Sequence, residues 1–363
     1  MHRSPARTTR LLALAAAAPL LMGLAACSND AAADSDSGSD GSGTADELRL
    51  GYFANVTHAA ALIGVEEKLF EKELGDTKLS TQVFNAGPDV VEAVFAGALD
   101  AAYIGPSPAI NAYGQSDGEA VRIISGAASG GAQLVVRDGI DTPEDLKGTT
   151  LASPQLGNTQ DVALRAWLTD QGLENSIEGG GDVTIAPTAN ADTLTLFQDG
   201  ELDGAWLPEP WSSRLVLEAG AHVLVDEADL WDNGQFVTTN IIVRTEFLEQ
   251  YPDTVEALLR GHVAAVQEVT DDVDAAKEAV NKGLEDAGGS PLDAEVIDRA
   301  FENLEVTWEP LASTLQEEAQ HAVDAGTSEE LVDLEGIYDL RPLNAVLSDL
   351  DLDTVSAGGL GEE

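Results

Sequence analysis

Short apolar runs alternate with helical patterns along most of the chain. Residues 48–53 form the first strand candidate, and the segment THAAALIGVEEKLFEKELG predicts a helix that stops at Gly75. The apolar positions of this helix recur at helical spacing: Ala61, Leu62, Val65 and Leu69. Further strand candidates follow at 79–84, 99–104, 121–124 and 134–137. Strands that alternate with helices predict an α/β fold with mostly parallel sheets covered by helices on both faces.

The pattern changes after residue 236. The run FVTTNIIVR is one more strand candidate, and beyond Pro252 the chain predicts only helices, as far as about residue 325. We expect these helices to close one lobe of the fold. The acidic tail from Ser348 onward is predicted to be frayed.

Length and charge narrow the class of protein. The chain has 363 residues, which is enough for two ordinary lobes, and its 18 basic residues against 65 acidic residues give a formal charge of -47. Direct binding to nucleic acid is therefore not expected, because phosphates are neutralised by a basic face that this composition does not supply.

The N-terminus predicts a secreted lipoprotein. Three arginines precede an apolar run at 11–26, which is shorter than a membrane-spanning helix and shaped like a signal peptide. The run ends in Leu-Ala-Ala before Cys27, resembling the bacterial lipobox, in which the thiol receives diacylglycerol. Cys27 is the sole cysteine; the alternative is an accidental cysteine after an ordinary signal. We expect a signal peptide at 1–26 and a lipid anchor on the outer face of the cytoplasmic membrane.

A tether follows the predicted anchor. Residues 27–46 are rich in Ser, Gly, Asp and Ala and contain no large apolar residue, which is typical of a flexible charged linker. Removal of the three arginines with the signal leaves a mature charge of -50, which predicts a soluble and self-repelling surface.

Several segments together resemble one protein family. GYFANVTHAAALIG, GPSPAINAY, GNTQDVALRAWL, DGAWLPEPW and GQFVTTNIIVRTEFL are similar, in this order, to the solute-binding lipoproteins of ABC importers in the aliphatic sulfonate, nitrate and taurine group. The resemblance spans residues 48 to about 261. It implies a monomeric receptor that delivers a small solute to a separate permease and ATPase, and it implies no cofactor.

The same resemblance implies a fold and its boundaries. A type II periplasmic-binding fold has two doubly wound α/β lobes joined by two chain crossovers, with the ligand in the cleft between them. We place the crossovers near 134–138 and 238–244. Lobe 1 then covers 47–135 and 240–345 with the C-terminal helices, lobe 2 covers 136–239, and 346–363 is an acidic tail.

Helix starts are the candidate ligand contacts. In an open parallel sheet a ligand binds beyond the carboxyl ends of the strands, where unpaired N–H groups of the next helix attract anions. Ser107 before Pro108 has the pattern of an N-cap with proline at the first helical position. Asn55 or Thr57 predicts a second cap, and Asn158 or Thr159 a third. The stretch Ser129-Gly130-Gly131 offers bare backbone to a ligand.

By similarity, the PEPW segment lines the cleft from the second lobe. The full candidate set is Asn55, Thr57, His58, Ser107, Ser129, Gly130, Gly131, Asn158, Thr159, Gln160, Glu209 and Trp211. Each cap has a purely structural alternative, and His58 has the alternative of supporting the site from behind.

The ligand itself stays open between several choices. An aliphatic sulfonate is expected, and nitrate is an alternative. Glu209 disfavours an oxyanion beside it, and therefore raises the alternatives of taurine, which carries an amine, or a thiamine-precursor pyrimidine. Arg165 and Arg214 are the nearest basic residues, and both are expected in surface or interlobe ion pairs.

The sequence carries no signature of catalysis among the common motifs. The five histidines show no metal-binding spacing, no P-loop is present, and GPSPA lacks the glycine of a nucleophile elbow. Pyrimidine-precursor synthases share the implied fold but carry a cysteine cluster, so an enzyme is the lesser alternative; a protein that only scaffolds or adheres is another. We expect no metal and no enzymatic activity.

Overall fold

The computed structural model describes residues 43–363, of which all belong to one compact unit. The predicted signal peptide, Cys27 and most of the tether lie outside the described residues. Ala45, which the sequence assigns to the tether, is buried, and its N–H donates to Thr254 Oγ1 at 2.8 Å. The ordered chain therefore begins before the first strand.

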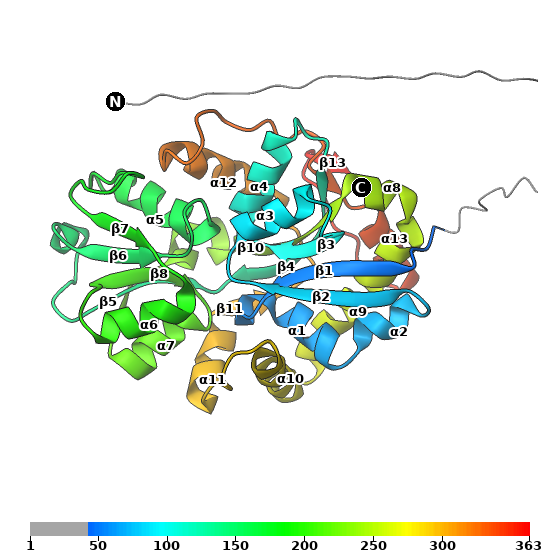
Figure 1. Ribbon diagram of the computed structural model, residues 1–363, viewed down its shortest axis with the longest axis horizontal. Helices are drawn as coiled ribbons and strands as arrows, with labels where there is room; N and C mark the ends of the chain where they lie inside the picture. The colour runs from blue at the N-terminus through cyan, green and yellow to red at the C-terminus, as the bar shows by residue number, and fades with distance from the viewer. Residues whose placement is uncertain (1–42) are drawn as a thin grey trace, which may run out of the picture. The chain divides into compact units, whose positions relative to one another are not determined.

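The first sheet has eight strands and lies at the centre and right of Figure 1. Its strands are β1 (Glu47–Phe53), β2 (Lys78–Phe84), β3 (Ala101–Ile104), β4 (Val121–Gly130), β10 (Val237–Arg244), β11 (Leu304–Val306), β12 (Tyr338–Asp339) and β13 (Gly361–Glu362). The order is β13-β12-β4-β10-β3-β1-β2, with β11 on β4. Strand β1 is parallel to both β2 and β3, whereas β10 is antiparallel to β3 and β4.

The second sheet has five strands and lies at the left of Figure 1. Its strands are β5 (Ala132–Val136), β6 (Thr150–Ser153), β7 (Thr184–Pro187), β8 (Gly204–Pro208) and β9 (His222–Asp226), in the order β7-β6-β8-β5-β9. Alternate residues of β5 enter different cores, with Leu134 on one face and Val135 on the other. Burial of both faces explains why the central strands β5 and β8 read as nearly continuous apolar runs, whereas the edge strands β7 and β9 are partly exposed.

Helices cover both sheets. Around the first sheet lie α1 (Ala59–Glu66), α2 (Leu69–Leu74), α3 (Gly87–Phe95), α4 (Pro106–Gln115), α8 (Thr245–Gln250), α9 (Pro252–Asp271), α10 (Val273–Asp286) and α13 (Arg341–Asp349). The second sheet carries α5 (Thr159–Asp170), α6 (Asn190–Gln198) and α7 (Trp211–Ala219). Helices α11 (Ala294–Glu302) and α12 (Ala312–Asp324) contact both groups, since α11 packs on α7 and α12 packs on α4 and α5. We call each sheet with its own helices a lobe.

Short 3-10 turns complete the element list. They are η1 (Val56–His58), η2 (Pro143–Leu146), η3 (Glu227–Leu230) and η4 (Asp232–Gly234). No helix among residues 43–363 combines the length and the apolar character needed to cross a membrane.

The chain crosses between the sheets at other positions than predicted. Strand β4 passes into β5 through Gly130 and Gly131, both with positive φ (74° and 76°), so the first crossing precedes 134–138. The second crossing lies between β9 and the start of β10 at Val237, so 238–244 lies inside the first sheet. The apolar runs predicted strands correctly. However, the sequence of a strand that is buried on both faces does not indicate which of the two sheets it belongs to.

The predicted frayed tail is wrong for most of its length. Strand β13 pairs with β12 near the C-terminus, and three apolar residues before it are buried: Val355, Ala357 and Leu360. These three residues are spaced among acidic and small residues. The composition of the tail therefore did not predict that this segment packs on the first sheet.

Candidate ligand-binding cleft

A polar crevice separates the two lobes. Its lining residues are Phe53, Asn55, Thr57, His58, Asn85, Gly105, Asn158, Thr159, Gln160, Asn190, Pro208, Thr238 and Thr239. Most of them follow the carboxyl ends of parallel strands: Asn55 follows β1, Asn85 follows β2, and Gly105 follows β3. This is the place where ligands bind in open α/β sheets, and the second lobe contributes the start of α5 from the other side.

Buried polar atoms without partners face this crevice. Within the described chain, Thr159 Oγ1, Asn190 Oδ1 and Thr239 Oγ1 are buried and make no hydrogen bond, and all three residues line the cavity. A buried polar atom without a partner costs about 1–3 kcal/mol. Three such atoms around one cavity therefore favour a guest, water or solute, that hydrogen-bonds to them.

His58 presents an uncharged donor to the crevice. Its side chain is 2% exposed and packs on Phe53, with ring centroids 4.4 Å apart. The Phe53 N–H donates to Nδ1 at 3.3 Å, so the ring proton is assigned to Nε2. Burial lowers the pKa of His58 to about 3, which keeps the ring neutral at physiological pH.

The crevice is closed in this structure. Its volume open to water is about 20 Å³, which is close to the space for a single water molecule. Sites for small organic ligands usually measure about 300–1,000 Å³. A solute therefore enters only when the lobes separate or the lining side chains rotate.

A wider mouth adjoins the crevice. It has a volume of about 210 Å³ and shares Asn55, Asn85 and Asn190 with the crevice. Its apolar residues are Ala54, Val83, Phe84, Ala189, Ala191, Pro210, Trp211, Leu284, Ala287 and Leu292. Among residues 43–363, no Asp or Glu lines either cavity, and Arg214 at the mouth is the one Lys or Arg.

Hydrogen bonds close the cleft from lobe to lobe. Trp211 Nε1 donates to Asn55 Oδ1 at 2.8 Å, and the Gly87 N–H donates to Asn158 Oδ1 at 3.0 Å. The N–H groups of Val56 and Thr57 both point to the Glu209 carbonyl oxygen, at 3.1 and 3.5 Å. The helix start at η1, predicted to hold a ligand, is thus occupied by the other lobe.

The predicted caps are right in position and wrong in bonding. Asn55 and Asn158 stand at the N-caps of η1 and α5, but neither side chain makes a cap hydrogen bond. Asn55 accepts from Trp211 instead, and Asn158 accepts from Gly87 and donates to Gln160 Oε1 at 3.1 Å. Both amides serve contacts between distant segments.

Ser107 is not the predicted N-cap. Helix α4 begins one proline earlier, with Gly105 as N-cap and Pro106 in the first turn, so Ser107 is already inside the helix. Its side chain is buried near Glu318 of α12 and is not part of the crevice lining in the described chain. Because β3 ends at Ile104, the helix begins at Pro106 and not at Pro108 as predicted.

The backbone predicted to be bare at 129–131 is paired within the chain itself. Strand β11 pairs with this stretch, placing Glu305 opposite Ser129 and Leu304 opposite Gly130. The Gly131 N–H donates to the Asn303 carbonyl at 2.7 Å. The chain itself, about 170 residues downstream, uses the backbone groups that the sequence left open for a ligand.

Glu209 is buried and bonded inside the protein. Its side chain is 0% exposed, and its carboxylate accepts from the Ser213 N–H at 3.2 Å, Arg299 Nη1 at 3.1 Å and Asn303 Nδ2 at 2.6 Å. It lines neither cavity of the described chain. Sequence reasoning missed Arg299 and Asn303, because a single Arg on an amphipathic helix carries no motif.

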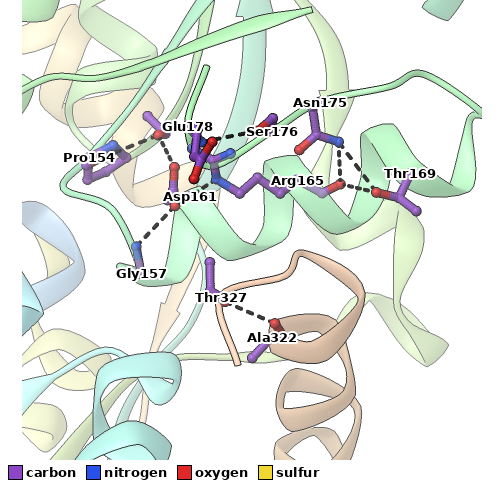
Figure 2. Close-up of polar contacts among 11 residues, drawn as sticks. Pro154, Gly157, Asp161, Arg165, Thr169, Asn175, Ser176, Glu178, Ala322 and Thr327 are labelled. Atoms are coloured by element: carbon purple, nitrogen blue, oxygen red, sulfur yellow. Dashed lines mark hydrogen bonds and ion pairs between the residues drawn. The ribbon is translucent and has the colours of Figure 1, made fainter. Parts of the chain in front are cut away.

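The two arginines singled out from the sequence make local pairs. Arg165 is buried and pairs with Asp161 on the same helix at 3.0 Å, where the Gly157 N–H also donates to Asp161 (Figure 2). The expected surface or interlobe role of Arg165 is therefore wrong. Arg214 pairs with Glu218 one turn on and stacks over Trp211, 5.1 Å from the ring centroid.

No group of three or more His, Cys, Asp or Glu residues in the described chain is arranged to hold a metal ion. The cleft offers amides, hydroxyls and one neutral imidazole, which suit an uncharged or anionic guest.

Residues 42–282 match the sequence model of the NMT1-like family. The chain belongs to this family. The resemblance derived from the quoted motifs is thereby confirmed, since curated relatives include binding proteins of the taurine and aliphatic sulfonate group.

Two curated relatives illustrate the extent of the match. The taurine-binding periplasmic protein of Escherichia coli K12 is 28% identical over 208 residues, which cover 57% of this chain and 62% of that protein. A putative aliphatic sulfonates-binding protein of Bacillus subtilis is 27% identical over 288 residues, covering 77% and 80%. The chain thus spans less than two thirds of the E. coli relative.

Solved structures confirm the predicted fold class. The alkanesulfonate-binding protein SsuA from Xanthomonas axonopodis pv. citri, bound to MOPS, superposes with a TM-score of 0.66 at 21% identity over 80% of this chain and 97% of that one. The nitrate-binding protein NrtA from Synechocystis PCC 6803 gives 0.68 at 15% identity, over 84% and 89%. By their names, these relatives bind taurine, aliphatic sulfonates, alkanesulfonates or nitrate.

Proposed function

We propose that this protein is the lipid-anchored receptor of an ABC importer and that it captures a small sulfonate with an uncharged organic tail. The cleft closes on the solute, and the closed form then delivers it to a permease and ATPase on separate chains. The names of the relatives support the sulfonate class, and the chemistry of the cleft supports the narrower choice.

One observation carries the proposal. In a chain with 65 acidic residues, both cavities of the described cleft are free of carboxylates, while the crevice gathers hydroxyl, amide and imidazole groups. A sulfonate is a diffuse anion that accepts several hydrogen bonds, so the neutral donors His58 Nε2, Thr159 Oγ1 and Thr239 Oγ1 suit it. These donors act at contact distance, where solvent does not screen them.

The mouth supports an uncharged tail. Val83, Phe84 and Trp211 are among its apolar residues, and they would remove the methylenes of an alkyl chain from water. A taurine ammonium would find no carboxylate there. Glu209, the acid that raised the taurine alternative, is occupied by Arg299 and Asn303.

Nitrate and a pyrimidine remain the competing ligands. Nitrate would use the crevice alone and leave the apolar mouth without a role. A pyrimidine would need two opposed walls for its ring, and Trp211 is bonded edge-on to Asn55 through its indole nitrogen. We therefore rank both below an alkanesulfonate.

The fold supports a hinge mechanism. The single-residue passage between β4 and β5 at Gly131, with positive φ at two glycines, provides a compact pivot. A solute that bonds to both lobes stabilises the closed form over the open one. Micromolar affinity corresponds to about -8 kcal/mol, which a few charge-assisted hydrogen bonds and a buried alkyl chain supply.

Calorimetry tests the proposal directly. The purified protein is titrated with 1-butanesulfonate, taurine, nitrate and a hydroxymethylpyrimidine. We expect micromolar binding of 1-butanesulfonate and binding of taurine that is at least about tenfold weaker. Tighter binding of taurine would refute the uncharged tail, and heat from none of the four ligands would refute the sulfonate receptor.

The anchor is a separate part of the proposal. Cys27 is proposed to carry the lipid that holds the protein at the outer face of the cytoplasmic membrane. Metabolic labelling with a fatty acid in a bacterial host tests it: label in the wild type and none in Cys27→Ser is expected. Equal labelling of both would refute the anchor.

A further inference from the structure

The segment from α11 into β11 is attached to both lobes. Strand β11 pairs with β4 of the first sheet, while α11 packs on α7 of the second lobe and on η1 of the first. Figure 1 shows α11 and β11 beneath the region where the two sheets meet. In addition to the two chain crossings, this segment thus connects the lobes through non-covalent contacts.

Arg299 makes three hydrogen bonds from this segment to the second lobe. Its guanidinium donates to Glu209 Oε1 at 3.1 Å, Ser213 Oγ at 2.7 Å and Gln133 Oε1 at 2.7 Å. These acceptors come from β5, the end of β8 and α7, so one side chain binds three elements of the second lobe. The Arg299 side chain is 20% exposed, and the carboxylate it meets is fully buried.

The next residues of the segment lie on the pivot itself. The Asn303 carbonyl accepts from the Gly131 N–H, and a Cβ added to Gly130 would lie 2.9 Å from the same carbonyl oxygen. Asn303 Nδ2 also donates to Glu209. Rotation of the second lobe about the two glycines must therefore strain or break the bonds of Arg299 and Asn303.

Glu209 connects these contacts to the cleft. Its carbonyl oxygen accepts from Val56 and Thr57 of the first lobe, and its carboxylate fixes the start of α7 through the Ser213 N–H. Trp211 lies at the same helix start and bonds to Asn55 across the mouth. The positions of Trp211 and Asn55 at the mouth thus depend on Glu209, which does not itself line the mouth.

We propose that Arg299 is a positioning residue that holds the two lobes in the closed arrangement by binding Glu209, Ser213 and Gln133 beside the hinge. Without Arg299, the Glu209 carboxylate stays buried and lacks its cationic partner. An unpaired buried charge is strongly unfavourable, and separation of α11 from α7, which both contact this carboxylate, lets water reach it. The loss of Arg299 therefore shifts the equilibrium toward the open form.

Distance measurement by electron spin resonance tests this without any ligand. The full chain carries Cys27→Ser, so that spin labels at Glu92→Cys in α3 and Asp170→Cys in α5, both exposed, are the sole labels. We expect Arg299→Met to move the distance distribution toward longer values. The matched control is Arg260→Met, because Arg260 pairs with Asp349 within the first lobe.

A rescue variant separates positioning from general stability. In Arg299→Met with Glu209→Gln, no unpaired charge remains, so the distribution should return toward the wild-type distances. Arg299→Lys keeps the positive charge but loses the planar guanidinium with its several donors. Its distance distribution should lie between those of the wild type and Arg299→Met. Circular dichroism checks that each variant is folded.

Two results would overturn the proposal. One is an Arg299→Met distribution identical to that of the wild type in the folded protein. The other is an equal shift in Arg260→Met. Neither depends on the identity of the ligand, so the sulfonate proposal and the hinge proposal fail separately.

Discussion

His58 shows how burial selects the chemistry of a single residue. With Nδ1 accepting from the backbone and the pKa lowered to about 3, the ring offers one neutral donor at Nε2. An anion gains a hydrogen bond from it without the desolvation cost of a buried charge. Of the two roles considered from the sequence, Nδ1 provides support by binding the Phe53 N–H, and the proposed ligand contact would use Nε2.

We predict that His58→Phe weakens binding of 1-butanesulfonate by about tenfold to a hundredfold, which is the value of a hydrogen bond to a charged group. Phenylalanine keeps the ring against Phe53 and removes the donor. Calorimetry measures the affinity, and thermal unfolding checks the fold. Unchanged affinity in a folded variant would show that His58 does not contact the ligand.

A buried acid, Glu227, lies in the segment that returns from the second sheet to the first. Glu227 begins η3 on the return path to β10, is 2% exposed, and accepts from Trp206 Nε1 at 2.7 Å. Burial is the main cause that raises the pKa of Glu227 to about 7, and Asp226 adds to the rise. Glu318 of α12 is also buried, and the Glu227 charge contributes to raising its pKa.

The raised pKa has a definite consequence for stability. The folded protein retains the Glu227 proton above pH 4.5, where an unfolded chain releases it. This contribution is complete below pH 4.5 and is lost as the pH rises through about 7.

We predict that the difference in unfolding free energy between wild type and Glu227→Gln falls from pH 4.5 to 7.5 by on the order of 3 kcal/mol. Denaturant unfolding at several pH values measures it. Glu201→Gln, at an exposed position, serves as the matched control. A pH-independent difference for Glu227→Gln would contradict the prediction.

At the scale of the whole molecule, the lobes meet at a pivot that tolerates no side chain. Gly130 has a φ of 74°, and an added Cβ would lie 2.9 Å from the Asn303 carbonyl. Gly139 has a φ of 92° but open space around its Cβ position. The two glycines differ in crowding and share the unusual backbone.

We predict that Gly130→Ala lowers the unfolding free energy by about 2–4 kcal/mol, and that Gly139→Ala lowers it by about 1–2 kcal/mol, because only the first adds a clash to the backbone strain. Denaturant unfolding at constant pH compares both with the wild type. Equal losses of unfolding free energy would show that the Asn303 carbonyl moves away from the added Cβ without a measurable loss of stability.

The sequence by itself determined the α/β class, the family and most of the alternation of strands and helices as far as β10. These features depend on local periodicity, on caps and breakers, and on segments short enough to be read directly, such as GNTQDVALRAWL. It also placed Asn55, His58 and Thr159 at the cleft, because the carboxyl ends of parallel strands must meet there. It missed β11, which lies where only helices were predicted, and it predicted one helix where Lys68, with a φ of 58°, separates α1 from α2.

Only the tertiary structure decided which groups are free to bind a solute. The Glu209 carboxylate is paired with Arg299, which lies 90 residues away in the sequence. The Gly131 N–H donates to the carbonyl of Asn303, the residue just before β11. Such pairings between distant segments follow from how the lobes pack, and no local pattern encodes them. That is why the sequence predicted much of the crevice lining and missed Arg299, which bonds to the second lobe beside the hinge.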